Sequence, residues 1–153
     1  MPLQNHDPPS AANQLPWHES RLRVRYPEVD SQGVVHHSYF LHYFEIARTE
    51  LLRSVGLPYS QLEKDGVQLM VTESALRHHR PARYDEVLRL LCRAEEVTRV
   101  RIYIAYRILR EGTDELICDG KTVLAGIDPG TGKPTALPRS LALSLSSRRA
   151  SAS

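Results

Sequence analysis

Residues Tyr26 to Leu52 read YPEVDSQGVVHHSYFLHYFEIARTELL, and this pattern determines most of what the sequence predicts about the fold. Its second half repeats large apolar side chains at spacings of three and four residues, the period of an amphipathic helix. We predict a long helix that begins at Ser38 and ends before Gly56 and Pro58. Because the apolar stripe is largely aromatic, it should pack against a broad surface such as a sheet. The stripe consists of Phe40, Tyr43, Phe44, Ala47, Leu51 and Val55.

The remainder of the central chain is typical of strands. Residues 21–26 alternate charged and apolar side chains, which indicates a half-buried strand, and a short helical turn is expected at residues 59–64. After Gly66, four longer alternating runs follow one another between turn residues, which predicts an antiparallel meander. The fold class is therefore α+β, with the long helix covering one face of the sheet. The four runs are Val67 to His78, Glu86 to Val97, Val100 to Arg110 and Leu116 to Ile127.

Length and composition indicate one globular domain, because the chain has 153 residues of which 41% are apolar and 25% charged. Residues 1–19 contain four prolines among small polar residues, and we expect a flexible arm there. Residues 139–153 are rich in serine and contain Arg148 and Arg149, so we expect a disordered tail with at most a helical turn near Leu141 to Leu145. Residues 20–138 form the working domain.

Charge and cysteine content narrow the class of protein. The formal charge of +2, from 20 basic and 18 acidic residues, is too balanced to predict a nucleic-acid partner. No apolar run approaches the roughly 20 residues of a membrane span, and the first residues lack the apolar core of a signal peptide. Cys92 and Cys118 lie far apart in apolar stretches, which suits reduced thiols. We therefore expect a cytoplasmic protein without a membrane span.

The chemistry centres on Asp30, which lies in a turn just before the predicted helix. A helix start carries about half a positive charge and unpaired N–H groups, so the backbone near His37 suits an anion or a developing oxyanion. A carboxylate base beside such a site is what acyl transfer to water requires. The alternative is that Asp30 and Gly33 only shape a turn.

The longer pattern resembles the 4-hydroxybenzoyl-CoA thioesterase family, in particular its YbgC-like acyl-CoA thioesterase branch. The resemblance covers about residues 20–138, and it departs from the family at His36, where an aromatic residue is usual, and at Ser38, where Asn is common. Ser38 can still cap the helix. The matching residues are Tyr26, Asp30, Gly33, Val34, Val35, His37, Tyr39, Glu45 and Arg48, followed by Pro81 to Asp85.

This resemblance implies a hot-dog fold, in which a curved five-stranded antiparallel sheet wraps a long central helix. It implies an acyl-CoA thioester hydrolase without a cofactor, with Asp30 as general base or nucleophile and with the helix start near His37 polarising the thioester carbonyl. It also implies a homodimer or homotetramer with the site at the subunit interface. Long strands with open edges support the same expectation, because proteins usually cover such edges.

The resemblance places the substrate against Gly33, Val35, Tyr39 and Glu45, and each of the more polar candidates has an alternative role. His37 either hydrogen-bonds substrate or Asp30, or it only packs. Tyr39 either lines the acyl pocket or belongs to the core. Glu45 either supplies a carboxylate to the site or forms an i,i+3 ion pair with Arg48, which we favour.

Three other functions were weighed against hydrolysis. A metal site is not expected, because adjacent histidines on a strand point apart and the remaining histidines do not share a helix face. A dehydratase acting on 3-hydroxyacyl thioesters would use a histidine together with the helix carboxylate of Glu45. A non-catalytic acyl-CoA binding or sensing module would keep the pocket without turnover. Five arginines suit the phosphates of CoA, although the sequence does not select among them: Arg77, Arg80, Arg83, Arg99 and Arg101.

Overall fold

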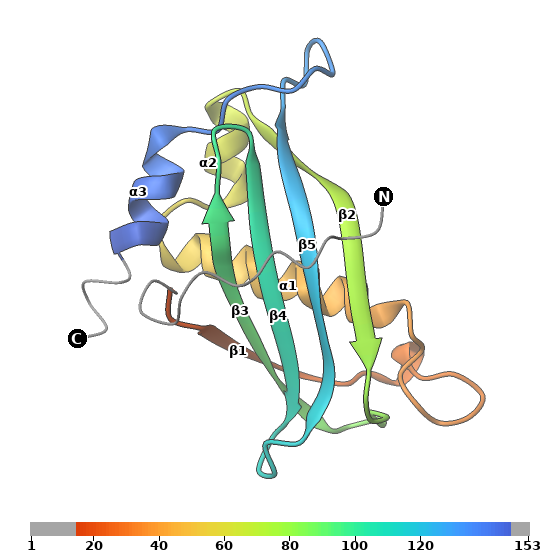
Figure 1. Cartoon of the computed structure of the whole chain (residues 1–153). Coiled ribbons are helices and arrows are strands. Elements are labelled where there is room, and N and C mark those ends of the chain that lie inside the picture. The colour runs from red at the N-terminus through yellow and green to blue at the C-terminus, as the bar shows by residue number, and fades with distance from the viewer. Residues whose placement is uncertain (1–14, 148–153) are drawn as a thin grey trace.

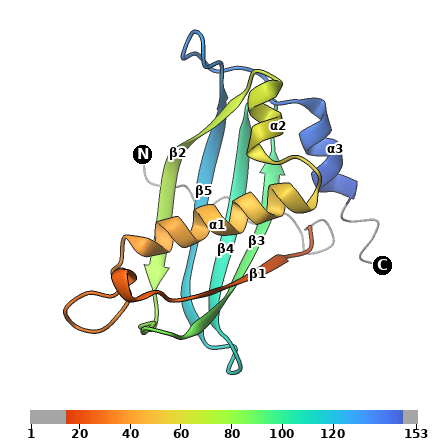
Figure 2. The same ribbon diagram turned by 180° about the vertical axis from the view of Figure 1, so that it is seen from behind.

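A computed structural model describes residues 15–147 of the chain (Figure 1). A single five-stranded antiparallel sheet curves around one long helix, α1, which crosses one face of it (Figure 2). This arrangement confirms the predicted α+β class and hot-dog fold. The elements in chain order are β1 (His18–Arg23), the 3-10 turn η2 (Tyr26–Glu28), α1 (Tyr39–Ser54), α2 (Tyr59–Lys64), β2 (Gln68–His78), β3 (Val87–Val97), β4 (Arg101–Arg110), β5 (Leu116–Ile127) and α3 (Arg139–Ser147).

Helix α1 packs its apolar stripe on the sheet as predicted. The ring of Phe44 stacks on Tyr106 of β4, with 4.2 Å between their centroids. A Cβ atom at Gly120 of β5 would lie 2.7 Å from the Phe44 ring, so this position needs glycine for the helix to approach. Val55, the last residue of the predicted stripe, is only half-buried. The buried residues of the stripe are Phe40, Tyr43, Phe44, Ala47 and Leu51.

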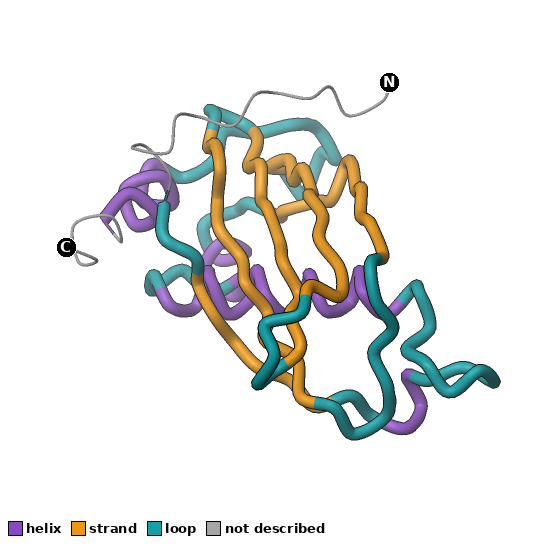
Figure 3. The backbone as a smooth tube through the Cα atoms, turned by 60° about the horizontal axis from the view of Figure 1, so that its bottom comes forward, coloured by secondary structure: helices purple, strands orange, loops and turns teal. Residues whose placement is uncertain are grey.

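The strand order is β1-β3-β4-β5-β2, so the prediction of a four-strand meander is wrong for β2. Strands β3, β4 and β5 do form a meander, but β1 occupies the free side of β3 and pairs with it from His18 to Arg23. Strand β2 therefore pairs with β5, and residues 79–86 carry the chain across the end of the sheet (Figure 3). As a result β2 is an outer strand, and most of its side chains are exposed.

Strand β1 begins and ends earlier than predicted. It starts at His18, inside the expected N-terminal arm, and it ends at Arg23. Tyr26 was predicted to share a buried face with Leu22 and Val24, but it lies in η2 and is 74% exposed. The physical reason is Pro27, which favours the start of a helical turn and cannot donate to a strand ladder. Residues 1–14 of the expected arm lie outside the described residues.

The C-terminal prediction of a disordered tail is wrong for residues 139–147, which form helix α3. Leu141 and Leu145 stand one turn apart on one face of α3, and both are buried in the main core. This amphipathic pair stabilises the whole helix, whereas the sequence suggested a single turn. The folded body therefore extends to residue 147, and residues 148–153 lie outside the described part of the chain.

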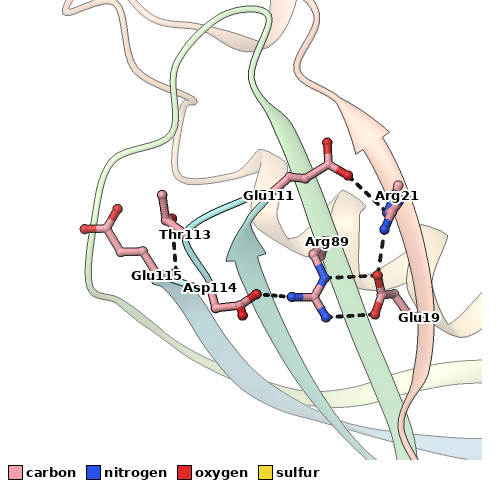
Figure 4. Close-up of polar contacts among 7 residues, drawn as sticks. All are labelled: Glu19, Arg21, Arg89, Glu111, Thr113, Asp114 and Glu115. Atoms are coloured by element: carbon pink, nitrogen blue, oxygen red, sulfur yellow. Dashed lines mark hydrogen bonds and ion pairs between the residues drawn. The ribbon is translucent and has the colours of Figure 1, made fainter.

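An ion-pair cluster on the outer face joins β1 to β3 (Figure 4). Arg89 of β3 donates two parallel hydrogen bonds to the carboxylate of Glu19 on β1, at 3.0 and 2.9 Å. Arg89 also contacts Asp114 in the turn between β4 and β5, and Arg21 lies 3.3 Å from Glu111. The bidentate geometry favours this register of β1 on β3.

The two cysteines are buried and form no disulfide, as expected for reduced thiols. Cys92 lies on β3 and Cys118 on β5, so strand β4 separates them and a disulfide between them is excluded by the sheet order. Burial raises the pKa of the Cys118 thiol to about 12. Within residues 15–147, the helices are too short or too polar to cross a membrane.

Candidate active site

Asp30 sits at the start of a tight turn whose hydrogen bonds its own side chain completes. The Gly33 amide donates to the Asp30 carbonyl at 2.9 Å, and the Gln32 amide donates to Asp30 Oδ1 at 2.8 Å. Gly33 has a φ of +78°, in the left-handed region that favours glycine. Asp30 and Gly33 therefore both shape this turn. No described residue donates to the second carboxylate oxygen, Oδ2, so the turn occupies only half of this carboxylate.

The two ends of the Asp30 loop are tied together by Glu28, a residue that the sequence did not single out. Its side chain is buried and its Oε1 accepts hydrogen bonds from the Arg25 amide at 2.8 Å and from the Tyr43 hydroxyl at 3.2 Å. Its backbone carbonyl accepts from the His36 amide at 2.9 Å. Burial, followed by the Glu28 carboxylate, raises the pKa of Tyr43 above its ordinary value. Glu28 thus connects the loop to α1.

The start of α1 leaves one backbone donor without a protein acceptor. Ser38 occupies the N-cap position but does not cap the helix as expected; its hydroxyl lies 2.8 Å from His36 Nδ1, and its amide donates to the same nitrogen at 3.2 Å. The Tyr39 amide donates to the His36 carbonyl at 3.0 Å. Among the described residues, none accepts a hydrogen bond from the His37 amide. This donor lies at the positive end of the helix dipole.

A pocket of about 330 Å³ joins the Asp30 turn to the start of α1 and the end of β2. Of the six predicted site residues, Asp30, Val35 and His37 line it. Asp30 is half-buried, Val35 is buried, and the His37 side chain is exposed. The complete lining is Asp30, Val34, Val35, His37, Phe40, His78, His79, Arg80 and Pro81.

His78, the last residue of β2, and His79, which follows it, also line this pocket, and neither was among the predicted site residues. The His78 ring packs edge-on against Phe40, with 5.2 Å between centroids. Burial, then the neighbouring His37 and His79, lowers the pKa of His78 below its ordinary 6.5. His79 Nε2 lies 2.7 Å from Asp119 Oδ1. No three metal-binding side chains gather anywhere in the described part of the chain.

The other three predicted site residues lie outside the Asp30 pocket. Tyr39 and Glu45 line a separate groove of about 530 Å³ on the outer side of α1, which Arg25 and Ile46 also line. Tyr39 is half-buried and packs against the core as well as lining this groove. Gly33 lines neither cavity and acts through the backbone of the Asp30 turn.

The expected ion pair between Glu45 and Arg48 does not form in the described structure. Arg48 is turned into the protein, where its Nε donates to the Tyr59 hydroxyl at 3.1 Å. The Glu45 side chain is exposed and lines cavities on the outer side of α1. Three-residue spacing permits a pair, but the burial of one partner prevents it here.

The Asp30 pocket is therefore lined by a carboxylate residue and by His37, the residue whose helix-start amide has no acceptor among the described residues. A carboxylate can take a proton from water or attack a carbonyl, and an amide at a helix start can stabilise the oxyanion that forms. The lowered pKa of His78 favours the neutral ring, which can both donate and accept a hydrogen bond.

The family of the chain follows from comparison with known proteins. The acyl-CoA thioesterase YbgC of Haemophilus influenzae is 33% identical over 120 residues, which span 77% of this chain and 86% of that protein. The crystal structure of a hypothetical protein from Thermus thermophilus is 35% identical, with a TM-score of 0.78 over 84% of this chain and 97% of that chain. A DHNA-CoA thioesterase structure from Staphylococcus aureus is 28% identical, with a TM-score of 0.81 over 88% of this chain and 91% of that chain. The model of the thioesterase-like superfamily matches residues 24–145, and the chain belongs to that family.

Proposed function

We propose that this protein hydrolyses acyl-CoA thioesters to a carboxylic acid and free CoA at the Asp30 pocket. The observation that carries the proposal is that Asp30 and His37 line one pocket and that the His37 amide has no acceptor among the described residues. A thiolate is a good leaving group, so one carboxylate and one oxyanion donor can suffice without a triad.

The proposed reaction places the thioester carbonyl oxygen at the His37 amide. Asp30 either takes a proton from water as the water oxygen attacks the carbonyl carbon, or attacks that carbon itself. In the first route the tetrahedral intermediate expels CoA as a thiolate, which then takes up a proton. In the second route CoA leaves first, and water then hydrolyses the mixed anhydride on Asp30. Both routes consume one water and release the same two products.

The names of two relatives support CoA thioesters as the substrate class. The Haemophilus influenzae relative is named an acyl-CoA thioesterase, and the Staphylococcus aureus structure is that of a DHNA-CoA thioesterase. A dehydratase is less well supported, because the helix carboxylate of Glu45 does not line the pocket that contains Asp30 and His37.

We also propose that the functional unit is a homodimer joined at the outer edge of β2, with a homotetramer as a pair of such dimers. Apolar side chains gather on β2 and on the adjoining side of α1; Met70 is 54% exposed and Leu41 is 43% exposed. A second β2 strand at this edge would extend the sheet and cover its unpaired backbone groups. Val71 and Leu41 line a cavity between β2 and α1, so a partner at this edge would also close substrate-binding space.

A reducing compartment, and hence the cytoplasm, is the proposed location. The support is chemical, because Cys92 and Cys118 are buried thiols that form no disulfide and lie on strands that are not neighbours in the sheet. Persistent free thiols are typical of proteins kept under reducing conditions.

The experiment that tests the function is a colorimetric free-thiol assay over short-chain, long-chain and aromatic acyl-CoAs. The proposal predicts thiol release with at least one of them, at a rate proportional to enzyme concentration. Thiol release at the background rate with every acyl-CoA would contradict it. Saturable binding by calorimetry with the acyl-CoA recovered intact would identify a binding module in its place.

A further inference from the structure

Arg48 of α1 is a buried cation with no carboxylate partner among the described residues. It does not line the Asp30 pocket. Arg48 is only 8% exposed to solvent. Its Nε donates to the Tyr59 hydroxyl, and none of the described carboxylates comes within ion-pair distance of it. A buried guanidinium without an anion costs several kcal/mol, so the absence of a carboxylate needs an explanation.

The groups around Arg48 are polar but neutral. Tyr106 also lies close enough to Arg48 to interact with it, and the Tyr106 hydroxyl is 2.6 Å from the hydroxyl of Thr122. Thr122 is 2% exposed. Tyr59, Tyr106 and Thr122 therefore orient the guanidinium without neutralising it, which leaves its charge available to a ligand.

Arg48 and Thr122 line a cavity of about 360 Å³ between α1, β2 and β5. Leu41 and Val71 give this cavity apolar walls. Glu45 also lines it, but Glu45 is exposed and forms no ion pair with Arg48 among the described residues, where Arg48 donates to Tyr59. The remaining lining residues are Ser38, His42 and Ser74. The cavity thus combines apolar walls with one buried cation.

The position of this cavity relative to the Asp30 pocket suits the far end of an acyl group. His37 lines one cavity and Ser38 the other, and on β2 the corresponding residues are His78 and Ser74. Arg48 lies nine residues after Tyr39, the first residue of α1, which corresponds to a rise of about 14 Å along the helix. Because Ser38 and Arg48 line the same cavity, that cavity extends along α1 from the residue next to His37 to Arg48.

We propose that the Arg48 cavity binds a terminal carboxylate, so that the preferred substrates are acyl-CoAs whose acyl chain ends in a second carboxyl group. This inference rests on the proposed thioesterase function and names its substrate class. The guanidinium forms charge-assisted hydrogen bonds to the carboxylate, and the Leu41 and Val71 walls contact the methylene chain.

The test compares suberoyl-CoA with octanoyl-CoA, which have acyl chains of equal length and differ in the terminal carboxylate. The proposal predicts a kcat/KM at least about tenfold higher for suberoyl-CoA, the value of a charge-assisted hydrogen bond. Arg48→Met should lower the kcat/KM for suberoyl-CoA far more than that for octanoyl-CoA and so abolish the preference, and Arg48→Lys should keep part of it. Arg53→Met, on the exposed side of the same helix, is the matched control and should keep the preference.

Equal kcat/KM values for the two substrates in the wild-type protein would overturn the proposal, and this result needs no variant to fold. An Arg48→Met protein that loses both activities equally would also overturn it, because Arg48 would then be structural or paired with a second copy of the chain. If neither of these two esters nor any other acyl-CoA of the panel is hydrolysed, the thioesterase function fails. Calorimetry on the two CoA esters then tests carboxylate binding in the Arg48 cavity separately from turnover. Tighter binding of suberoyl-CoA than of octanoyl-CoA supports the proposal, and equal binding overturns it.

Discussion

The Tyr43 hydroxyl donates a 3.2 Å hydrogen bond to the buried carboxylate of Glu28, two residues before Asp30. This bond joins the loop that carries Asp30 to the helix whose start forms the other half of the pocket. Hydrogen bonds to charged groups contribute about 1.5–3 kcal/mol, and the bond is buried from solvent. The relative positions of Asp30 and the His37 amide therefore depend on it.

Tyr43→Phe is predicted to lower the free energy of unfolding by about 2 kcal/mol, because it leaves Glu28 short of one donor. Urea denaturation measures the change. Tyr103→Phe is the control, because the Tyr103 hydroxyl forms no hydrogen bond within the described structure. A double-mutant cycle with Glu28→Gln should give a coupling energy above about 0.5 kcal/mol. Strictly additive effects would show that the two side chains do not act as a pair.

Gly33→Ala is predicted to destabilise the protein by about 1–2 kcal/mol, because alanine is strained at a φ of +78°. No atom lies within 4 Å of the added methyl group, so the cost comes from the backbone alone. Gly112→Ala is a matched control with a φ of +86° in the turn between β4 and β5. Both variants should lose similar stability in urea denaturation, but only Gly33→Ala should lose activity. Equal activity in both would show that the Asp30 turn tolerates distortion.

Met70→Lys is predicted to dissociate the proposed dimer, because it places two like charges at the edge where two β2 strands would meet. Light scattering should report a smaller particle, and activity should fall with it. Leu143→Lys is the control, since Leu143 is 69% exposed on α3 and away from this edge. A Met70→Lys protein with unchanged mass and activity would locate the subunit contact elsewhere.

Stability is predicted to fall as the pH drops below about 6.5, in part because of His78. Its pKa is lower in the folded protein than in the unfolded chain, so the unfolded chain binds the proton more readily. The stabilisation is present above the unfolded pKa and is lost as the pH falls through the folded value. His78→Asn should therefore flatten the dependence of unfolding free energy between about pH 8 and pH 5, and exposed His42→Asn serves as control. An unchanged slope would exclude His78 as the cause.

The helix and the strands were predictable because each has a strong local period. The α1 stripe and the alternating runs of β3, β4 and β5 match the structure closely. The partner of β2 was not predictable, because alternation sets which side chains are buried but not which neighbouring strand they adjoin. Helix α3 was missed because two leucines among serines give a weak pattern, and their burial depends on a core built by distant strands.

The candidate site also contains residues that the sequence predicted and residues that it missed. Asp30, Val35 and His37 share a short stretch of chain, and the structure places them around one pocket. The contribution of His78 depends on β2 lying at the sheet edge beside α1, which no local pattern encodes. Glu28 was missed because a glutamate between proline and valine looks solvent-exposed, whereas the Tyr43 hydroxyl fifteen residues away gives it a buried partner.

The most direct test of the central claim is the turnover of acyl-CoA by Asp30→Asn in the free-thiol assay. Asparagine keeps a side-chain oxygen for the Gln32 amide, so the turn survives while the base or nucleophile is lost. Asp128→Asn is the matched control, because Asp128 accepts the Gly130 and Thr131 amides in a similar turn at the other end of the sheet. We predict a fall in kcat of about 10²- to 10⁴-fold for Asp30→Asn and little change for Asp128→Asn. Full activity in a folded Asp30→Asn protein would contradict the account.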